Sequence, residues 1–155
     1  SLNFSDYWFV TKEYGDQFPK TILELHDMVM SVRGSVGKIG IVGKKHVQSQ
    51  ISPNCIRLKS DPSKILPLLF YYTLKQDVFV NQILNSVSTS AVPGISAESI
   101  KSLKIIVPVT FVQIRFEKIV KAIFQTIDNN RINQFTLSKI RDSLLPKLMS
   151  GEIRV

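Results

Sequence analysis

The feature that most constrains this chain is a long segment, from Val109 to Leu145, that contains neither glycine nor proline. Apolar side chains recur along it at spacings of three and four residues, which is typical of an amphipathic helix. A helix of this length is well above the usual range for a globular protein, so we expect it to protrude and to pair with a second helix. Pro146 is expected to end or kink the helix.

A heptad pattern predicts which face of this helix pairs. Four of the five a positions are apolar, but only two of the five d positions are, so the seam is imperfect. Two asparagines lie in its middle, where buried polar side chains lower stability but fix register and partner choice. The predicted pairing residues are Phe116, Ile119, Ile123, Ile127, Asn130, Asn133, Leu137, Ile140 and Leu144. The alternative is an amphipathic helix that packs against its own domain.

Before this segment, short runs rich in β-branched residues predict β-strands. Residues 27–32 and 38–42 flank a glycine-rich turn, and residues 48–59 continue in the same style. A further strand is expected over residues 103–107, where Pro108 stops it. The first two thirds of the chain therefore contain strands as well as helices.

Two helices are expected among these strands. Apolar residues spaced three and four positions apart predict one helix over residues 65–84. Ser96 can cap a second, short helix that runs through Ser102. The fold class that follows is α+β. A small mixed globular domain is expected over residues 1–110, followed by a long helix over residues 111–155 that forms a coiled coil.

The charge of the chain is strongly positive and unevenly spread. Twenty Lys and Arg residues stand against twelve Asp and Glu residues, which gives a net charge of +8. Residues 33–64 carry seven of the basic residues and a single acidic one, Asp61, whereas residues 1–32 are net acidic. A dense basic block suits a polyanion such as nucleic acid. The alternative is a charged face that is merely solvated.

Several classes of function lack the residues that they need. Cys55 is the only cysteine, which excludes an internal disulfide and a multi-cysteine zinc site, and His26 and His46 have no partner at metal-ligand spacing. The glycines do not form a phosphate-binding loop or a dinucleotide fingerprint, and neither a nucleophile elbow nor the Asn-Pro-Pro-Tyr sequence of adenine methylation occurs. We therefore expect neither an enzyme nor a metal site.

No apolar run approaches the roughly 20 residues that a membrane span needs. The start of the sequence also lacks the basic flank and the apolar run of a signal peptide. We expect a soluble cytoplasmic protein that does not associate with a membrane.

The glycine-rich turn between the first two predicted strands offers groups that suit DNA. Gly34 and Gly37 lie where a positive φ or a close backbone approach is needed. The turn also presents backbone N–H groups, a hydroxyl, an arginine and a lysine, which fit phosphates and base edges. The alternatives are an ordinary hairpin, and an Arg33 that pairs with an acid such as Asp27 instead of contacting DNA.

The sequence RGSVGKIG at residues 33–40 resembles the signature of target-recognition domains in type I restriction-modification specificity subunits. The features that follow it come in the same order as in that family. They are a glutamine-containing strand at 50–58, LFYYTLK at 69–75, a Ser/Thr loop at 88–90, LKIIVP at 103–108 and the closing helix IRDSLLPKLMSGEIRV at 140–155. The family's Pro-Pro-Leu-x-Glu-Gln motif is degenerate here, at residues 108–113.

The resemblance implies a non-catalytic subunit. In that family two recognition domains each read one half of a split double-stranded DNA target, and their conserved helices pair as an antiparallel coiled coil. The coiled coil sets the spacing and docks methyltransferase subunits, which a restriction subunit joins. S-adenosylmethionine, Mg²⁺ and ATP are then expected only on those partner subunits. One domain with one helix is expected to be a carboxyl-terminal fragment or a half-subunit, and its helix to form a homodimer.

The predicted DNA-binding residues come from the basic block, the glycine turn and the Ser/Thr loop. They are Arg33, Ser35, Lys38, Lys44, Lys45, Gln48, Gln50, Ser88, Thr89 and Ser90. The competing hypothesis is a helical assembly module in which the heptad acts and the basic block only keeps the domain soluble. Salt-dependent DNA binding separates the two hypotheses, because neutralised phosphates release counterions.

Overall fold

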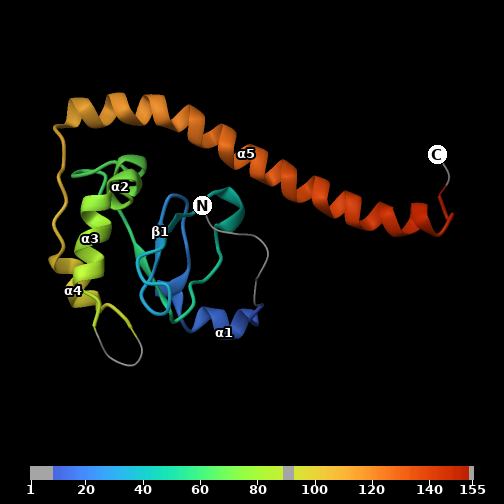
Figure 1. Cartoon of the computed structure of the whole chain (residues 1–155), viewed down its shortest axis with the longest axis horizontal. Coiled ribbons are helices and arrows are strands. Elements are labelled where there is room, and N and C mark those ends of the chain that lie inside the picture. The colour runs from blue at the N-terminus through green and yellow to red at the C-terminus, as the bar shows by residue number, and fades with distance from the viewer. Residues whose placement is uncertain (1–8, 89–92, 154–155) are drawn as a thin grey trace. The chain divides into compact units, whose positions relative to one another are not determined.

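A computed structural model describes residues 9–88 and 93–153 of the chain (Figure 1). By compactness the chain divides into one unit that ends at Lys121 and a second that begins at Ala122. The expected α+β class is confirmed, because a small antiparallel sheet and several helices precede one long helix. Compact units are not the same as domains, so the expected division between residues 110 and 111 stays a prediction.

The sheet has three antiparallel strands in the order β2-β1-β3. The strands are β1 (Met28–Ser31), β2 (Ile39–Ile41) and β3 (Cys55–Leu58). The two strands predicted around the glycine turn are therefore confirmed. The strand predicted over residues 48–59 is wrong except at its end, because the amide of Cys55 bonds the carbonyl of Ser52 and closes a turn just before β3.

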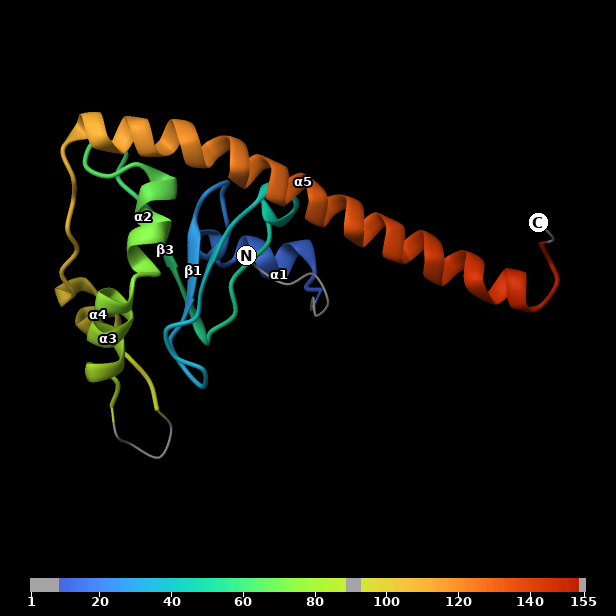
Figure 2. The same ribbon diagram turned by 45° about the horizontal axis from the view of Figure 1, so that its top comes forward.

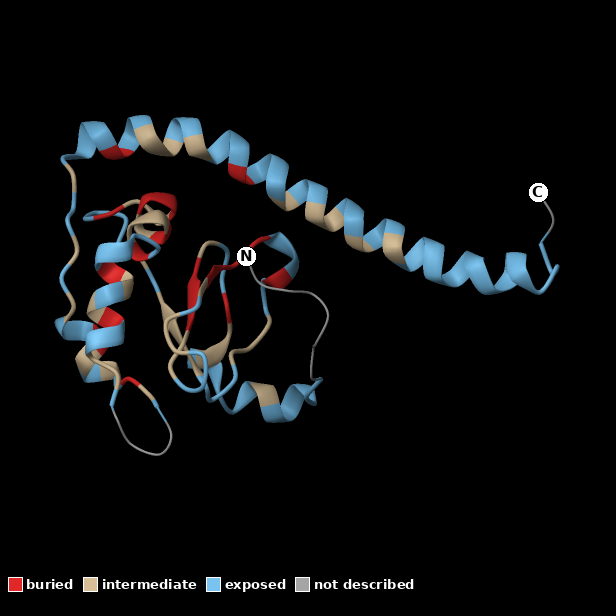
Figure 3. Cartoon of the chain, in the orientation of Figure 1, coloured by how far each residue is buried: buried red, intermediate tan, exposed pale blue. Residues whose placement is uncertain are grey.

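Both faces of β1 are buried. Side chains alternate along a strand, so Met28 and Met30 point to one face and Val29 to the other. Met28 and Met30 are fully buried, while Val29 packs in a cluster with Leu23 and Val42. Figure 3 shows most of β1 and β2 as buried, together with parts of α2 and α3, whereas β3 is only half-buried.

Short helices surround the sheet. They are α1 (Lys12–Asp16), α2 (Pro67–Leu74), α3 (Asp77–Asn85) and α4 (Ala97–Ser102), together with the 3-10 turns η1 (Pro19–Thr21) and η2 (Lys44–His46). The predicted cap is confirmed, because the Ser96 hydroxyl accepts a hydrogen bond from the amide of Ser99 at 3.0 Å.

The single helix predicted over residues 65–84 is wrong, because the chain breaks between α2 and α3. The amides of Lys75 and Gln76 bond carbonyls three residues back, and Gln76 is extended. The buried side chains of the two helices would lie around more than half of one straight helix, which is wider than one packed face. Those side chains are Leu68, Leu69, Tyr71, Leu74, Phe79 and Ile83. The break lets both helices turn their apolar residues to the core.

The strand predicted over residues 103–107 is also wrong. The side chain of Gln82 bonds both backbone groups of Lys104, donating to the carbonyl at 2.9 Å and accepting from the amide at 3.0 Å. A side chain of α3 thus takes the place of a neighbouring strand, and the segment is extended but outside the described sheet.

The long helix α5 runs from Thr110 to Met149 and confirms the prediction of one uninterrupted helix. Pro146 lies inside it, so of the two expected effects of this residue the end of the helix is wrong, and a kink stays a prediction. A proline in the last turn removes only its own N–H bond, and the next turn can still form. Gly151, with φ of 73°, ends the helix, and its amide bonds the carbonyl of Leu148. None of the described helices is long and apolar enough to cross a bilayer.

The expectation that the glycine turn needs positive φ is confirmed, because φ is 71° at Gly34 and 83° at Gly37. Alanine is strained at such a φ by about 1–2 kcal/mol. At Gly37 a Cβ would also lie 3.2 Å from Cγ2 of Ile83, whereas at Gly34 it meets no described atom within 4 Å.

Gly37→Ala should therefore lower the free energy of unfolding by more than Gly34→Ala does, and each should cost about 1 kcal/mol or more. Urea denaturation measures both, with Ser35→Ala in the same turn as the control of little effect. Equal losses for the two glycine variants would contradict a tight contact with Ile83.

Candidate nucleic-acid interface

The turn between β1 and β2 is held in shape by Ser31, at the end of β1. Its hydroxyl accepts from the amide of Lys38 at 3.0 Å and donates to the carbonyl of Ser35. Its carbonyl accepts from the amide of Gly37 at 2.9 Å. The bonds of one small polar side chain thus fix the turn before any ligand binds. Arg33, Ser35 and Lys38 are exposed on it.

A second loop lies against this turn. Arg33 forms a β-bridge with Gly94, and the amide of Ile95 bonds the carbonyl of Val32 at 3.1 Å. The carbonyl of Gly94 also accepts from the amide of Ser88 at 2.9 Å, so both sides of the loop are tied together. Figures 1 and 2 both show the turn beside the described ends of the segment that joins α3 to α4. The predicted residues Thr89 and Ser90 lie outside the described residues.

We name this end of the sheet the hairpin end and define it as residues 32–38, 88 and 93–95. Three predicted residues that come early in the basic block, Arg33, Ser35 and Lys38, lie there with Ser88, which is distant in the sequence. The structure therefore brings the glycine turn and part of the Ser/Thr loop together.

The other predicted residues lie elsewhere. Ile41 pairs with Met28 at the start of β1, so η2 with Lys44 and Lys45 follows at the end of the sheet opposite to the hairpin end. Lys44, Lys45 and Gln48 are exposed there. Gln50 is half-buried, and its amide donates to the carbonyl of Gly15 at 2.7 Å, which holds α1 in place.

Arg57, Lys59 and Lys64 of the basic block form ion pairs with acids among the described residues. Arg57 lies 3.7 Å from the carboxylate of Asp27, which is only 2% exposed, and also donates to the carbonyl of Ile22. Lys59 pairs with Glu24 at 2.7 Å, and Lys64 pairs with Asp61 at 3.7 Å. Asp27 thus pairs with Arg57, so the alternative that it pairs with Arg33 is wrong.

Hydrogen bonds lower the pKa of two of these acids. The ammonium group of Lys59 donates to Glu24 and lowers the pKa of that carboxyl. The hydroxyl and then the amide of Ser63 lower the pKa of Asp61. Both acids are therefore ionised at neutral pH and offset nearby positive charge. The basic block is less uniform in space than in the sequence.

Sequence reasoning missed a contact site at the start of α5. The side chain of Gln113 is buried and bonds backbone groups of Lys64, Leu66 and Pro108, while Glu117 accepts from the amide of Leu68. One signal was available in the sequence. α2 begins at Leu66-Pro67 without a Ser, Thr, Asp or Asn beside it, so its cap had to come from elsewhere.

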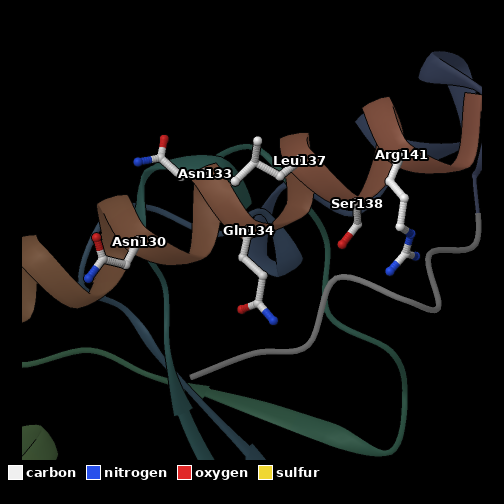
Figure 4. A pocket seen from close by; sticks show the side chains of 6 residues that line it. All are labelled: Asn130, Asn133, Gln134, Leu137, Ser138 and Arg141. Carbon is white, nitrogen blue, oxygen red and sulfur yellow. The ribbon is translucent and has the colours of Figure 1, made fainter. Parts of the chain in front are cut away.

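The predicted pairing residues of α5 are exposed, apart from Phe116, which is half-buried against Tyr72. Ile119 is 64% exposed and Leu137 is 65% exposed. The same spacing continues back to Val112 and Val109, the latter 73% exposed. Figure 4 shows a surface hollow on α5, with Asn133 and Leu137 pointing away from Gln134 and Ser138. Pairing itself stays a prediction.

A family model for the type I restriction modification DNA specificity domain matches residues 2–140. The chain belongs to this family. The resemblance that RGSVGKIG carries is thus confirmed.

Two relatives are themselves specificity subunits of type I restriction enzymes. The chain is 36% identical to the specificity subunit of the type I restriction enzyme MjaIX from Methanocaldococcus jannaschii. The alignment covers 86 residues, which is 56% of this chain and 20% of the relative. The chain is 28% identical to the specificity subunit of the type I restriction enzyme HindI from Haemophilus influenzae. That alignment covers 167 positions, which is 90% of this chain and 36% of the relative. The chain therefore spans about a third or less of the length of these curated relatives.

Arg57→Met should lower the free energy of unfolding by about 3 kcal/mol, because it leaves the buried carboxylate of Asp27 without its cation. Lys64→Met, which removes an exposed cation, should change stability little. Urea denaturation compares the two. An Arg57 variant as stable as the Lys64 variant would show that Arg57 is not needed for folding and is free to serve another role.

Proposed function

We propose that this chain is a non-catalytic DNA-specificity module whose hairpin end reads one half of a bipartite double-stranded target. The observation that carries the proposal is the joining of the glycine turn to the second loop, because it gathers Arg33, Lys38 and Ser88 at one end of the sheet. Membership in the specificity-domain family supports the same function.

The chemistry of the hairpin end suits base edges. An arginine can bond both major-groove acceptors of a guanine, and serine hydroxyls bond several bases. Arg33 and Lys38 are exposed and form no ion pair with any of the described residues. Ser31 holds the turn in one conformation, so little ordering entropy is lost when DNA binds.

The opposite end of the sheet suits phosphates. Lys44 and Lys45 lie one short strand away from the hairpin end, which is about 10 Å or three base-pair steps. Lysines at that distance contact the backbone beside the bases that the turn reads, and they position the module without selecting a sequence.

The module is also proposed to act in an assembly. Methyltransferase and restriction subunits would dock on it and bring S-adenosylmethionine, Mg²⁺ and ATP. A second copy of the chain, paired along α5, would supply the other recognition domain. The exposed apolar seam supports this pairing, because soluble monomers rarely expose long contiguous apolar stripes. In the alternative, α5 assembles the complex and the chain does not bind DNA directly.

The first test uses a random library of double-stranded DNA, with the chain alone and with its methyltransferase subunit. Lys44→Ala with Lys45→Ala should weaken binding to all sequences alike and reduce the salt slope by up to about two units. Arg33→Ala should instead relax base preference at one position, at a cost of about 1–3 kcal/mol.

Lys12→Ala, on the exposed helix α1, is the matched control and should leave both properties unchanged. Binding without salt dependence, or no binding in either state, would favour the alternative of an assembly module.

The second test measures oligomeric state by sedimentation at micromolar concentration. Ile123→Asp or Leu137→Asp should convert a dimer to a monomer, because each puts a carboxylate into the apolar seam. Gln125→Asp, exposed and off the seam, is the matched control and should stay dimeric. A monomeric wild-type chain, or dimers that both seam variants leave intact, would contradict pairing through α5.

A further inference from the structure

The strongest unassigned feature is the set of contacts that α5 makes with the start of α2. The side-chain amide of Gln113, only 4% exposed, makes three hydrogen bonds. Its oxygen accepts from the amide of Leu66 at 3.0 Å, and its nitrogen donates to the carbonyls of Lys64 at 3.0 Å and Pro108 at 2.8 Å. One buried side chain thus joins α5, the segment before it and the start of α2.

A second side chain of α5 binds the same helix end. Glu117, one turn further along, accepts from the amide of Leu68 at 2.7 Å. The first amides of a helix carry partial positive charge, so a carboxylate is favoured there. Leu66 gives α2 no side-chain cap of its own. Between the two residues, the rings of Phe116 and Tyr72 meet at 5.8 Å in an edge-to-face arrangement.

These contacts all lie on one face of the first two turns of α5, at spacings of three and four residues. The segment before them is held at Lys104 by the side chain of Gln82, but beyond that point Ile106 and Val109 are exposed. The polar contacts of Gln113 and Glu117, which we name the latch, therefore join the start of α5 directly to the start of α2.

We propose that Gln113 and Glu117 are positioning residues, and that the latch sets which spacing between two half-sites the protein accepts. This inference rests on the proposed function. The remainder of α5 beyond Glu117 is about 50 Å long at 1.5 Å per residue. A tilt of about 10° at its base would move its far end by roughly 8 Å, or more than two base-pair steps.

A latch of this kind matters because a loose joint would admit many spacings. With the joint fixed, a duplex whose half-sites are too close or too far apart can bind only one recognition domain at a time. The second contact and its effective concentration are then lost. The latch touches no DNA in this scheme and acts through the direction of α5.

The first experiment does not depend on DNA. Spin labels are attached to cysteines introduced at two exposed positions, Asp77→Cys on α3 and Thr136→Cys on α5. The native cysteine is removed by Cys55→Ser, and the labelled chain is diluted into unlabelled chain so that only distances within one chain are measured. Glu117→Ala should broaden the distance distribution between the labels relative to wild type. Glu117→Gln keeps an oxygen that accepts from Leu68 and should restore a narrow distribution. A Glu117→Ala distribution that superimposes on wild type would overturn the latch.

The second experiment measures binding to a series of duplexes that differ only in the spacer between the half-sites. Wild type should prefer its best spacer about tenfold over spacers two base pairs shorter or longer, and Glu117→Ala should prefer it less than about threefold. Binding to a duplex with one half-site should not change. Unchanged spacer preference in Glu117→Ala would overturn the positioning role, even where the distances broaden.

Gln113→Ala removes a buried amide, so thermal unfolding first checks that this variant folds. Glu117 is only half-buried, so Glu117→Ala is used for both experiments if the Gln113 variant does not fold. Gln125→Ala, exposed on the same helix, is the matched control and should behave as wild type in both experiments. A wild-type chain that binds no duplex would contradict the proposed function, whereas the label distances would still decide whether the latch exists.

Discussion

An α-helix cannot leave its first amides buried without acceptors, and α2 begins at a leucine and a proline that provide none. The acceptors come from α5, through Gln113 and Glu117. Because α2 supplies Leu68, Leu69 and Leu74 to the core, the core depends on the start of the long helix. This explains in physical terms why the compact unit extends past residue 110, as far as Lys121.

A second constraint acts at the sheet, where polar groups are held for structure at one end and presented at the other. The carboxylate of Asp27, buried before β1, is matched by Arg57 and by the amide of Glu24. At the other end of β1, the hydroxyl of Ser31 forms hydrogen bonds within the turn, while Arg33 and Lys38 remain exposed. One four-residue strand therefore joins a closed polar network to an open polar surface.

The parts of the fold that depend on local pattern could be predicted from the sequence. The short β-branched run around Val29, the cap at Ser96 and the glycine-free run of α5 all act within a few residues, and the strand, cap and helix that they predict are confirmed. The break after Leu74 and the loss of a strand at Lys104 depend on distant partners, namely the core and the side chain of Gln82. No local pattern contains those partners.

The candidate site divides in the same way. The motif identified Arg33 and Lys38 as neighbours because they share one turn. The structure places the predicted residue Ser88 beside them, because its amide bonds Gly94, which forms a β-bridge with Arg33. The basic block looked like one surface, but its lysines separate when β2 runs back along β1, and three of its cations pair with acids. Basic residues that are close in the sequence form one basic surface only where the backbone keeps them at the same end of the sheet.

The exposed seam of α5 gives the proposed DNA binding a physical link to the proposed pairing. In the proposed function, a single recognition domain would bind DNA through the small hairpin end alone, and so small a contact is weak on its own. In the proposed pair, a second recognition domain joined through α5 would bind the second half-site at the effective concentration that the joint allows. DNA that holds two such domains must favour the pair by the same free energy, because coupling between two binding events is reciprocal. Asn130 and Asn133 reduce the apolar area that the middle of the seam can bury, so the proposed pair would be stabilised less by its own contacts and more by correctly spaced DNA.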